Sequence, residues 1–165
     1  MATTPDELLA FLDRLGISHR TTSHPPLFTV EQSQSLRGQI PGAHTKNLFL
    51  TDRKRALYLV VACEDARIDL KSLHRRLGTT RFSFGSAERL RQVLAIEPGS
   101  VSPFAAINDA TSRVAIVLDA TMMEQPLLNF HPLVNTMTTS IKRADLIQFL
   151  DAVGHRPRIE AISQT

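Results

Sequence analysis

The sequence predicts a mixed α/β fold in which a largely antiparallel sheet, curled towards a barrel, is flanked by helices. Two observations support this class. Helical and strand patterns are interspersed along the 165 residues, and most of the strand patterns follow one another in hairpin-like succession. A doubly wound parallel sheet would need a crossover of about a dozen or more residues between successive strands. We therefore expect antiparallel pairing to dominate.

Length and composition favour a single folded domain over residues 1–165. Hydrophobic residues make up 42% of the chain and charged residues 21%, which is typical of globular proteins and not of disordered ones. No apolar run approaches the roughly 20 residues that a membrane-spanning helix requires. Asp6 and Glu7 stand where a signal peptide would carry positive charge. These features predict a cytoplasmic protein.

The only cysteine, Cys63, excludes an internal disulfide and any multi-cysteine metal site. This usage fits a reducing compartment. Because Cys63 follows the apolar run 58–62, we interpret it as a buried structural thiol in preference to a nucleophile.

Capping residues and a glycine mark the ends of the first predicted helices. Thr4 and Glu7 form a capping box with Pro5 at the first helical position, and Gly16 ends that helix. A second capping box, Thr29 with Gln32, predicts a short helix over 29–36. The remaining predictions are helices over 69–77, 86–94 and 143–153, strands over 17–22, 46–51, 56–62, 81–84, 101–107, 114–118, 127–130 and 135–141, and a loop over 37–44.

Positive charge is concentrated in one segment. Residues 67–91 contain seven Lys or Arg against Asp69 and Glu88, a net charge of +5, so the rest of the chain carries −2 of the total +3. Such asymmetry suits a surface that faces a polyanion, because neutralising phosphates releases counterions. A solvated helix face would show the same pattern, so charge alone leaves both interpretations open.

Most standard catalytic signatures are missing. The chain has no GxxxxGK[ST], GxGxxG after a strand, HExxH or GxSxG motif. Its six histidines are scattered without the spacing of metal ligands. We expect neither a metal nor a cofactor.

Three polar motifs at the ends of predicted strands are the candidate site. Lys46 and Asn47 open one strand, and His131 follows another. Between them, the turn over 99–103 could aim backbone N–H groups at a carbonyl oxygen that is becoming an oxyanion. Each motif also has a structural explanation: a solvated lysine, a turn that serves topology, and a His-Pro pair that closes a strand.

Taken together, these motifs resemble those of a known family. Residues 24–31 (HPPLFTVE), 42–50 (GAHTKNLFL), 98–104 (PGSVSPF) with 108–109 (ND), and 131–135 (HPLVN) are similar, in this order, to the YbaK/prolyl-tRNA editing superfamily. The match covers nearly the whole chain. It is closest to the freestanding alanyl-tRNA(Pro) deacylase branch, also called prolyl-tRNA synthetase-associated proteins.

The resemblance implies a YbaK-like fold and hydrolysis of the ester that joins alanine to the end of proline tRNA. A synthetase pocket discriminates weakly against a smaller substrate, since each missing methylene is worth only about 1–3 kcal/mol. A second, smaller pocket must therefore admit alanine and exclude proline. The implied partner is the acceptor end of tRNA(Pro), delivered with or without prolyl-tRNA synthetase or an elongation factor. No membrane or DNA partner is expected.

The resemblance also assigns roles to residues. Lys46 would hold the terminal nucleotide or its phosphate, and Asn47 would orient it. The backbone of the turn would bind and polarise the aminoacyl carbonyl, while a ribose hydroxyl of the substrate helps water to attack, so no protein nucleophile is needed. His131 would border the amino-acid pocket. The turn residues are Gly99, Ser100, Val101, Ser102 and Pro103, and the residues expected to cover the pocket are Leu27, Phe28 and Val30.

Arg75, Arg76 and Arg81 are the candidate contacts to the acceptor stem, on the basis of charge alone. One departure from the family pattern is visible, since Ala105 follows Pro-Phe where glycine is expected in many relatives. This change could alter the turn beside the pocket and so the choice of substrate.

Three alternatives stay open at this point. The same scaffold could clear cysteine, serine or threonine from another tRNA. A non-catalytic module could bind nucleic acid through the basic segment. Purely structural association with the synthetase is the third, and it would need an exposed apolar patch.

Overall fold

The computed structural model describes residues 2–26, 31, 35 and 39–164. Its centre is an eight-stranded sheet of order β1-β7-β6-β2-β3-β5-β8, with β4 paired to β2. The strands are β1 (His19–Ser23), β2 (Ala43–Thr51), β3 (Leu57–Cys63), β4 (Ser83–Phe84), β5 (Val114–Asp119), β6 (Leu127–Phe130), β7 (Met137–Lys142) and β8 (Arg158–Glu160).

The sheet is mixed and open. Four pairings are antiparallel (β1–β7, β6–β7, β2–β3 and β2–β4) and three are parallel (β2–β6, β3–β5 and β5–β8) within the described residues. The mixed α/β class is confirmed, but the sheet is not closed into a barrel. β1 and β8 stand at opposite ends of the strand order.

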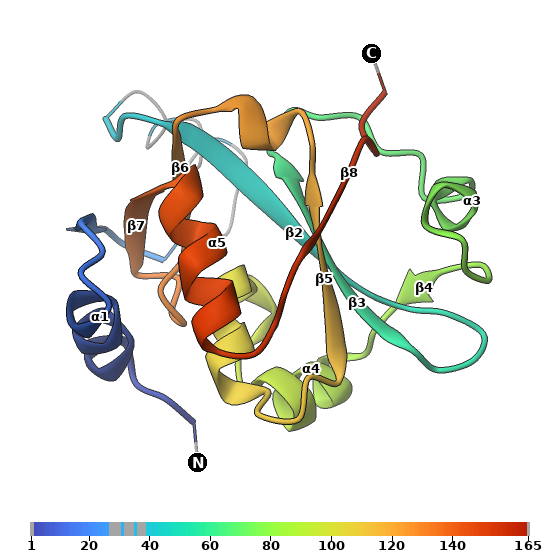
Figure 1. Ribbon diagram of the computed structural model, residues 1–165, viewed down its shortest axis with the longest axis horizontal. Coiled ribbons are helices and arrows are strands. Elements are labelled where there is room, and N and C mark those ends of the chain that lie inside the picture. Colours follow the sequence, from blue (N-terminus) through green and yellow to red (C-terminus); the bar gives the residue numbers. More distant parts are fainter. Residues whose placement is uncertain (1, 27–30, 32–34, 36–38, 165) are drawn as a thin grey trace.

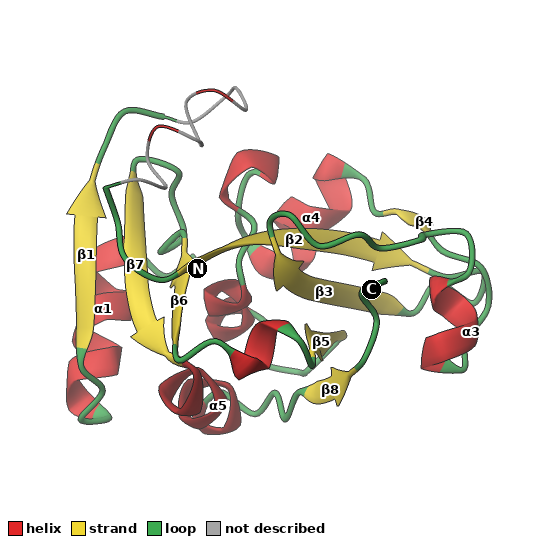
Figure 2. Ribbon diagram, turned by 90° about the horizontal axis from the view of Figure 1, so that it is seen from above, coloured by secondary structure: helices red, strands yellow, loops and turns green. Residues whose placement is uncertain are grey.

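Long strand β2 joins two groups of strands. Figure 2 shows β1, β7 and β6 on one side and β3, β5 and β8 on the other, with β2 running across both. The first part of β2 pairs with β6 and its remainder with β3 and β4. We call these groups the β6 half and the β3 half of the sheet.

Among the described residues, four α-helices cover the sheet (Figure 1): α1 (Pro5–Arg14), α3 (Leu73–Leu77), α4 (Ala87–Leu94) and α5 (Arg143–Ala152). The predicted capping box of α1 is confirmed. The Thr4 hydroxyl accepts from the Glu7 amide at 3.1 Å, and the Glu7 carboxylate accepts from the Thr4 amide at 3.0 Å. The described part of the chain contains no helix that is long and apolar enough to cross a membrane.

Two apolar clusters lie on opposite faces of the sheet. The larger one contains Phe49 of β2, Phe130 of β6 and the buried sides of α1, α4 and α5. Phe104 anchors it, with its ring edge-on to those of Phe130 and Phe149 at centroid distances of 5.8 and 5.4 Å. The smaller cluster contains Leu50 of β2 and covers the β3 half together with α3. Alternate residues of β2 therefore face different cores.

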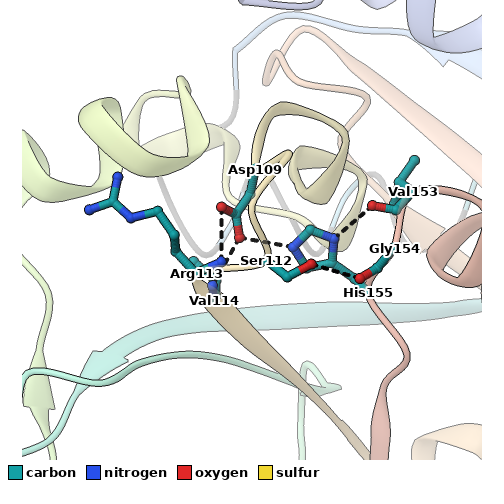
Figure 3. A network of polar contacts seen from close by, with 7 residues as sticks. All are labelled: Asp109, Ser112, Arg113, Val114, Val153, Gly154 and His155. Carbon is teal, nitrogen blue, oxygen red and sulfur yellow. Dashed lines mark hydrogen bonds and ion pairs between the residues drawn. The ribbon is translucent and has the colours of Figure 1, made fainter.

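A buried polar network fastens the C-terminal part of the chain to the turn before β5 (Figure 3). The Asp109 carboxylate accepts from the amides of Arg113 and Val114 at 3.1 and 2.9 Å, and it lies 2.8 Å from Nε2 of His155. Both side chains of the Asp109–His155 pair are 1% exposed. Ser112 adds a bond from its hydroxyl to the Gly154 carbonyl.

Several elements differ from their predictions. The strand expected over 101–107 is wrong, because Pro103–Asn108 forms a 3-10 helix whose N-cap, Ser102, accepts from the Phe104 amide. Pro103 cannot donate to a strand ladder and suits the first helical position. Helix α3 is shorter than 69–77, and β8 was not predicted. The helix expected over 29–36 lies largely outside the described residues.

Candidate active site

Lys46 lies in β2 on the face that leads to the smaller cluster. Residues 46, 48 and 50 share this face, and Leu48 and Leu50 belong to that cluster. The side chain of Lys46 is half-buried, and Nζ donates to the carbonyl of Ala66 in the turn after β3. An ammonium group with three donors keeps two of them for other acceptors. The structure thus holds the cation at the junction between the two halves of the sheet.

Asn47 points to the opposite face of β2, towards the larger cluster. Its partner Val61 belongs to that cluster, and the Oδ1 atom of Asn47 is buried with no hydrogen-bond partner among the described residues. Successive strand residues alternate between faces, so Lys46 and Asn47 are separated by the sheet. The role predicted for Asn47, orienting a nucleotide held by Lys46, is untested and would have to be exerted from this other face.

His131 follows β6 and lies beside His24. Its Nδ1 lies 2.9 Å from the Met137 carbonyl, and its ring centroid is 6.1 Å from that of His24. Burial lowers the pKa of His131, and the positive charges that His24 and His44 can carry lower it further, against the effect of the Met137 carbonyl. The lowered pKa favours a neutral imidazole at His131 near pH 7.

His24 and His44 each lie within hydrogen-bonding distance of neighbouring polar groups. His24 Nε2 lies 2.8 Å from the Thr138 hydroxyl, and its Nδ1 lies 2.9 Å from the Pro25 carbonyl. His44 precedes Lys46 by two residues on the same face of β2, and its Nε2 lies 3.3 Å from the Ile40 carbonyl. The structure therefore brings His24 beside His131, although they are more than a hundred positions apart in the sequence, and leaves His44 near enough to act on the charge of His131.

Asn129 fixes the start of β2 against β6. Its side-chain amide donates to the carbonyls of Pro41 and Ala43 at 3.0 and 3.3 Å, and its Oδ1 accepts from the Ser140 hydroxyl. Gly42 has a φ of +103°, and a Cβ there would lie 2.9 Å from Nδ2 of Asn129. Only glycine fits this close approach without displacing Asn129.

Sequence reasoning missed Asn129, Ser140 and Thr138 as members of this polar face. The face that carries Lys46 is polar in the β6 half, where these buried side chains take the place of apolar ones. The signal that could have revealed them is the presence of polar residues inside predicted strands: Asn129 within the apolar 127–130, and the run 138–140 within 135–141. That signal does not say which strands lie side by side.

The turn over 99–103 packs against the loop that begins at His131. A Cβ on Gly99 would lie 3.2 Å from Nδ2 of Asn135, while Ser100 and Ser102 are buried. Pro103 begins the 3-10 helix, and Val101 packs on the larger cluster. Gly99 and Ser100 line a cavity of about 660 Å³ together with Ile96 and residues 133–136. Lys46 is not among the residues that line it.

A second hollow, of about 300 Å³, lies at the N-terminal end of β2. It is lined by His44 and its neighbours Gly42 and Ala43, and by Cys63, Glu64, Asp65 and Gln125. Ala66, whose carbonyl accepts from Lys46, follows the lining residue Asp65 in the chain. Burial raises the pKa of the Cys63 thiol, and Asp65 and Asp119 raise it further, which disfavours a thiolate nucleophile.

The three arginines predicted to bind tRNA have different surroundings. Arg76 donates to the Ala161 carbonyl at 2.8 Å, so part of its guanidinium supports the C-terminal segment. Arg75 is exposed on α3. Arg81 is exposed and lines a separate hollow of about 420 Å³ with Lys71.

Leu27, Phe28 and Val30, predicted to cover the amino-acid pocket, lie outside the described residues. Within the described ranges, the structure holds no group of three or more His, Cys, Asp or Glu residues that could bind a metal ion.

Known proteins share both the sequence pattern and the fold. The family model named aminoacyl-tRNA editing domain matches residues 24–149. The prolyl-tRNA editing protein ProX of Acetoanaerobium sticklandii is 37% identical over 149 residues, which cover 90% of this chain and 91% of that protein. The prolyl-tRNA synthetase associated domain-containing protein 1 of Danio rerio is 36% identical over 155 residues, covering 93% and 84% of the two chains.

A solved structure, that of hypothetical protein APE2540, superposes with a TM-score of 0.75 at 16% identity and covers 95% of this chain and 99% of that one. At this identity the likeness shows the fold alone. The family match extends over most of the chain, in agreement with the ordered motifs of the sequence. The chain therefore belongs to the YbaK/aminoacyl-tRNA editing domain family.

Proposed function

We propose that this protein is a trans-editing deacylase that hydrolyses alanyl-tRNA(Pro) to alanine and tRNA(Pro). One observation carries the proposal beyond family membership. Lys46 and His44 share one face of β2, and His131, whose pKa responds to His44, borders the same polar area. A half-buried cation on the same face as His44 and the Asn129 amide suits a phosphate-bearing substrate whose ester must be held in place.

The roles follow from the chemistry of each group. The Lys46 ammonium would bind a phosphate or ribose oxygen of the terminal adenosine with the donors that Ala66 leaves open. His131, neutral near pH 7, would border the alanyl group without repelling its ammonium. The aminoacyl ester is already activated, so positioning and polarisation of its carbonyl would suffice for attack by water.

The turn over 99–103 would supply that polarisation through its backbone. The Ser100 amide donates to the Glu97 carbonyl at 2.9 Å, and the Phe104 amide donates to Ser102. The predicted contact to the aminoacyl carbonyl therefore rests on the other amides of the turn. A ribose hydroxyl of the substrate would help to orient the attacking water, since the proposal assigns no nucleophile to the protein.

A deacylation time course tests this function. Mischarged alanyl-tRNA(Pro) and correctly charged prolyl-tRNA(Pro) are incubated in parallel with the purified protein, and the remaining aminoacyl-tRNA is measured. We expect rapid loss of alanine and retention of proline, because the pocket excludes the larger ring. Equal rates for both substrates would contradict the size-exclusion mechanism.

The same assay distinguishes the alternatives. Cysteinyl-, seryl- and threonyl-tRNA are compared with alanyl-tRNA(Pro). Faster turnover of one of them would move the substrate assignment within the family. Salt-sensitive tRNA binding with no cleavage of any ester would instead support a non-catalytic module.

A further inference from the structure

Phe84 is a large apolar residue held in an exposed position. It lies in β4, opposite Leu50 of β2, and is 63% exposed. The backbone beside Phe84 is held against β2, because the Gly85 amide donates to the Phe49 carbonyl at 2.9 Å. A Cβ on Gly85 would lie 2.4 Å from the Phe49 ring, so the strand presses closely on that ring. The exposed ring is thus presented by an ordered strand.

Two cations stand beside this strand. Lys71 and Arg81 line one hollow with Leu70 and Phe82, and both cationic residues are exposed. The Phe82 ring packs edge-on against Tyr58 at 5.1 Å, which fixes the chain that leads from Arg81 to Phe84. The segment 67–91 that contains these residues carries a net charge of +5.

Phe84 and Lys46 lie on the same face of the sheet. Directly opposed residues of an antiparallel pair share a face, so Phe84 shares that of Leu50. Leu50 follows Lys46 by four residues, which places the two at a separation of about 13 Å along β2. Leu70 and Phe82, which line the hollow with the two cations, pack against the smaller cluster that contains Leu50. The cationic hollow, the exposed ring and Lys46 therefore lie on the same side of the sheet.

We infer that this track, defined as Lys71, Arg81 and Phe84, binds the unpaired 3′ end of the tRNA that leads into the site. Cations would contact the phosphates, and the ring would stack on a base next to the terminal adenosine. Aromatic rings flanked by cations on a sheet surface suit single-stranded RNA, because every base offers a π-face whatever its identity. This inference rests on the proposed function, since it places the polynucleotide relative to Lys46.

Steady-state deacylation with two substrates tests the inference. Alanyl-tRNA(Pro) carries the unpaired end, whereas alanyl-adenosine carries the same ester and terminal nucleoside without it. For Phe84→Ala, we expect KM for the tRNA to rise about fivefold or more with kcat little changed, because one stacking contact is lost. The ratio kcat/KM for alanyl-adenosine stays at the wild-type value.

Two further variants separate stacking from general surface effects. Phe84→Tyr keeps an aromatic face and should restore wild-type KM for the tRNA. Ile159→Ala removes another large apolar side chain, 50% exposed on β8 at the far end of the strand order, and should change neither substrate's kinetics. Lys71→Ala and Arg81→Ala should each weaken tRNA binding and reduce its salt dependence.

The outcomes separate this inference from the proposed function. A wild-type protein that cleaves neither ester would overturn the function itself. An active wild type whose tRNA kinetics are unchanged in Phe84→Ala would overturn only the track, as would equal losses on both substrates.

Discussion

The face of the sheet that carries Lys46 is polar in the β6 half and apolar in the β3 half, and β2 belongs to both halves. In the β6 half, the face that carries Lys46 also carries buried Asn129, Thr138 and Ser140. In the β3 half, the corresponding face carries Leu50, Val60 and Val117 and is covered by α3 and Ile162. Strand β2 belongs to both, so its polar start is held in place by its apolar end.

This difference shows how a small protein can keep polar groups ordered on a sheet. On the face that carries Lys46, apolar packing fixes the β3 half, whereas hydrogen bonds fix the β6 half. Buried polar groups cost free energy unless they are bonded, so this face of the β6 half depends on its hydrogen-bond partners. Substitutions in each half can test whether activity depends on the polar half and stability on both.

The largest effect is expected for Lys46→Ala. Loss of the cation should lower kcat/KM for alanyl-tRNA(Pro) by about 100-fold or more, the scale seen when a group that positions or stabilises the reacting centre is removed. The free energy of unfolding should change by only about 1 kcal/mol, because one hydrogen bond to Ala66 is lost. Deacylation kinetics and urea denaturation measure the two effects.

Lys54→Ala is the matched control for Lys46→Ala. Lys54 is an exposed cation in the turn between β2 and β3, in the other half of the sheet. Its removal should leave kcat/KM within about twofold of wild type, a surface effect of well under 0.5 kcal/mol. Equal losses in the two variants would mean that net charge, and not the position of Lys46, supports activity.

Asn129→Ala should affect both stability and activity. It leaves the Pro41 and Ala43 carbonyls and the Ser140 hydroxyl without this partner, at a cost of about 2–3 kcal/mol in the free energy of unfolding. Because Asn129 pairs with His44 in the β2–β6 ladder, kcat should also fall.

Thr79→Val provides the comparison from the β3 half. It removes the hydroxyl that donates to Asp52, so it should lower stability without lowering kcat. Urea denaturation and deacylation at a temperature where both variants are folded give the comparison. A matching loss of kcat in Thr79→Val would show that instability alone reduces activity.

Asp52→Asn should lower stability in a pH-dependent manner. Burial alone would raise the pKa of Asp52, but hydrogen bonds from Thr79 and from the amides of Ala56 and Lys54 outweigh it, so the pKa is lowered. A lowered carboxyl pKa stabilises the fold above the unfolded-state pKa, and this contribution disappears as the pH falls through the folded-state pKa. The variant should lose about 1–2 kcal/mol at pH 7 and converge on wild type in acid.

The smallest effect is a shift in pH dependence for His24→Gln. Burial first, and then His24 and His44, lower the pKa of His131, so its neutral form persists below its ordinary pKa. Removing the charge that His24 can carry should raise the pKa of His131 and move the acid limb of kcat/KM to higher pH. NMR titration of His131 checks the direction. An acid limb that stays in place would exclude coupling between the two rings.

Some features could be predicted from local sequence because their causes are local. The capping box at Thr4 and Glu7 predicts α1, and the strand-like segments 46–51 and 56–62 around the polar turn 52–55 predict the β2–β3 hairpin. The strand predicted over 101–107 failed because its apolar residues fit a 3-10 helix equally well once Ser102 and Pro103 set its start. Short strand β8 carries too weak a pattern to be recognised.

The candidate site also combines features that the sequence predicts with features that only the tertiary structure reveals. The sequence by itself determined the family, through four ordered motifs that contain Lys46, residues 99–103 and His131. Only the tertiary structure decided which apolar cluster lies on the faces of Lys46 and of Asn47, that His24 lies beside His131, and that Asn129 fixes the start of β2. The reason is physical: caps and periodicity act between residues a few positions apart, whereas strand pairing joins residues about a hundred positions apart and depends on the whole chain.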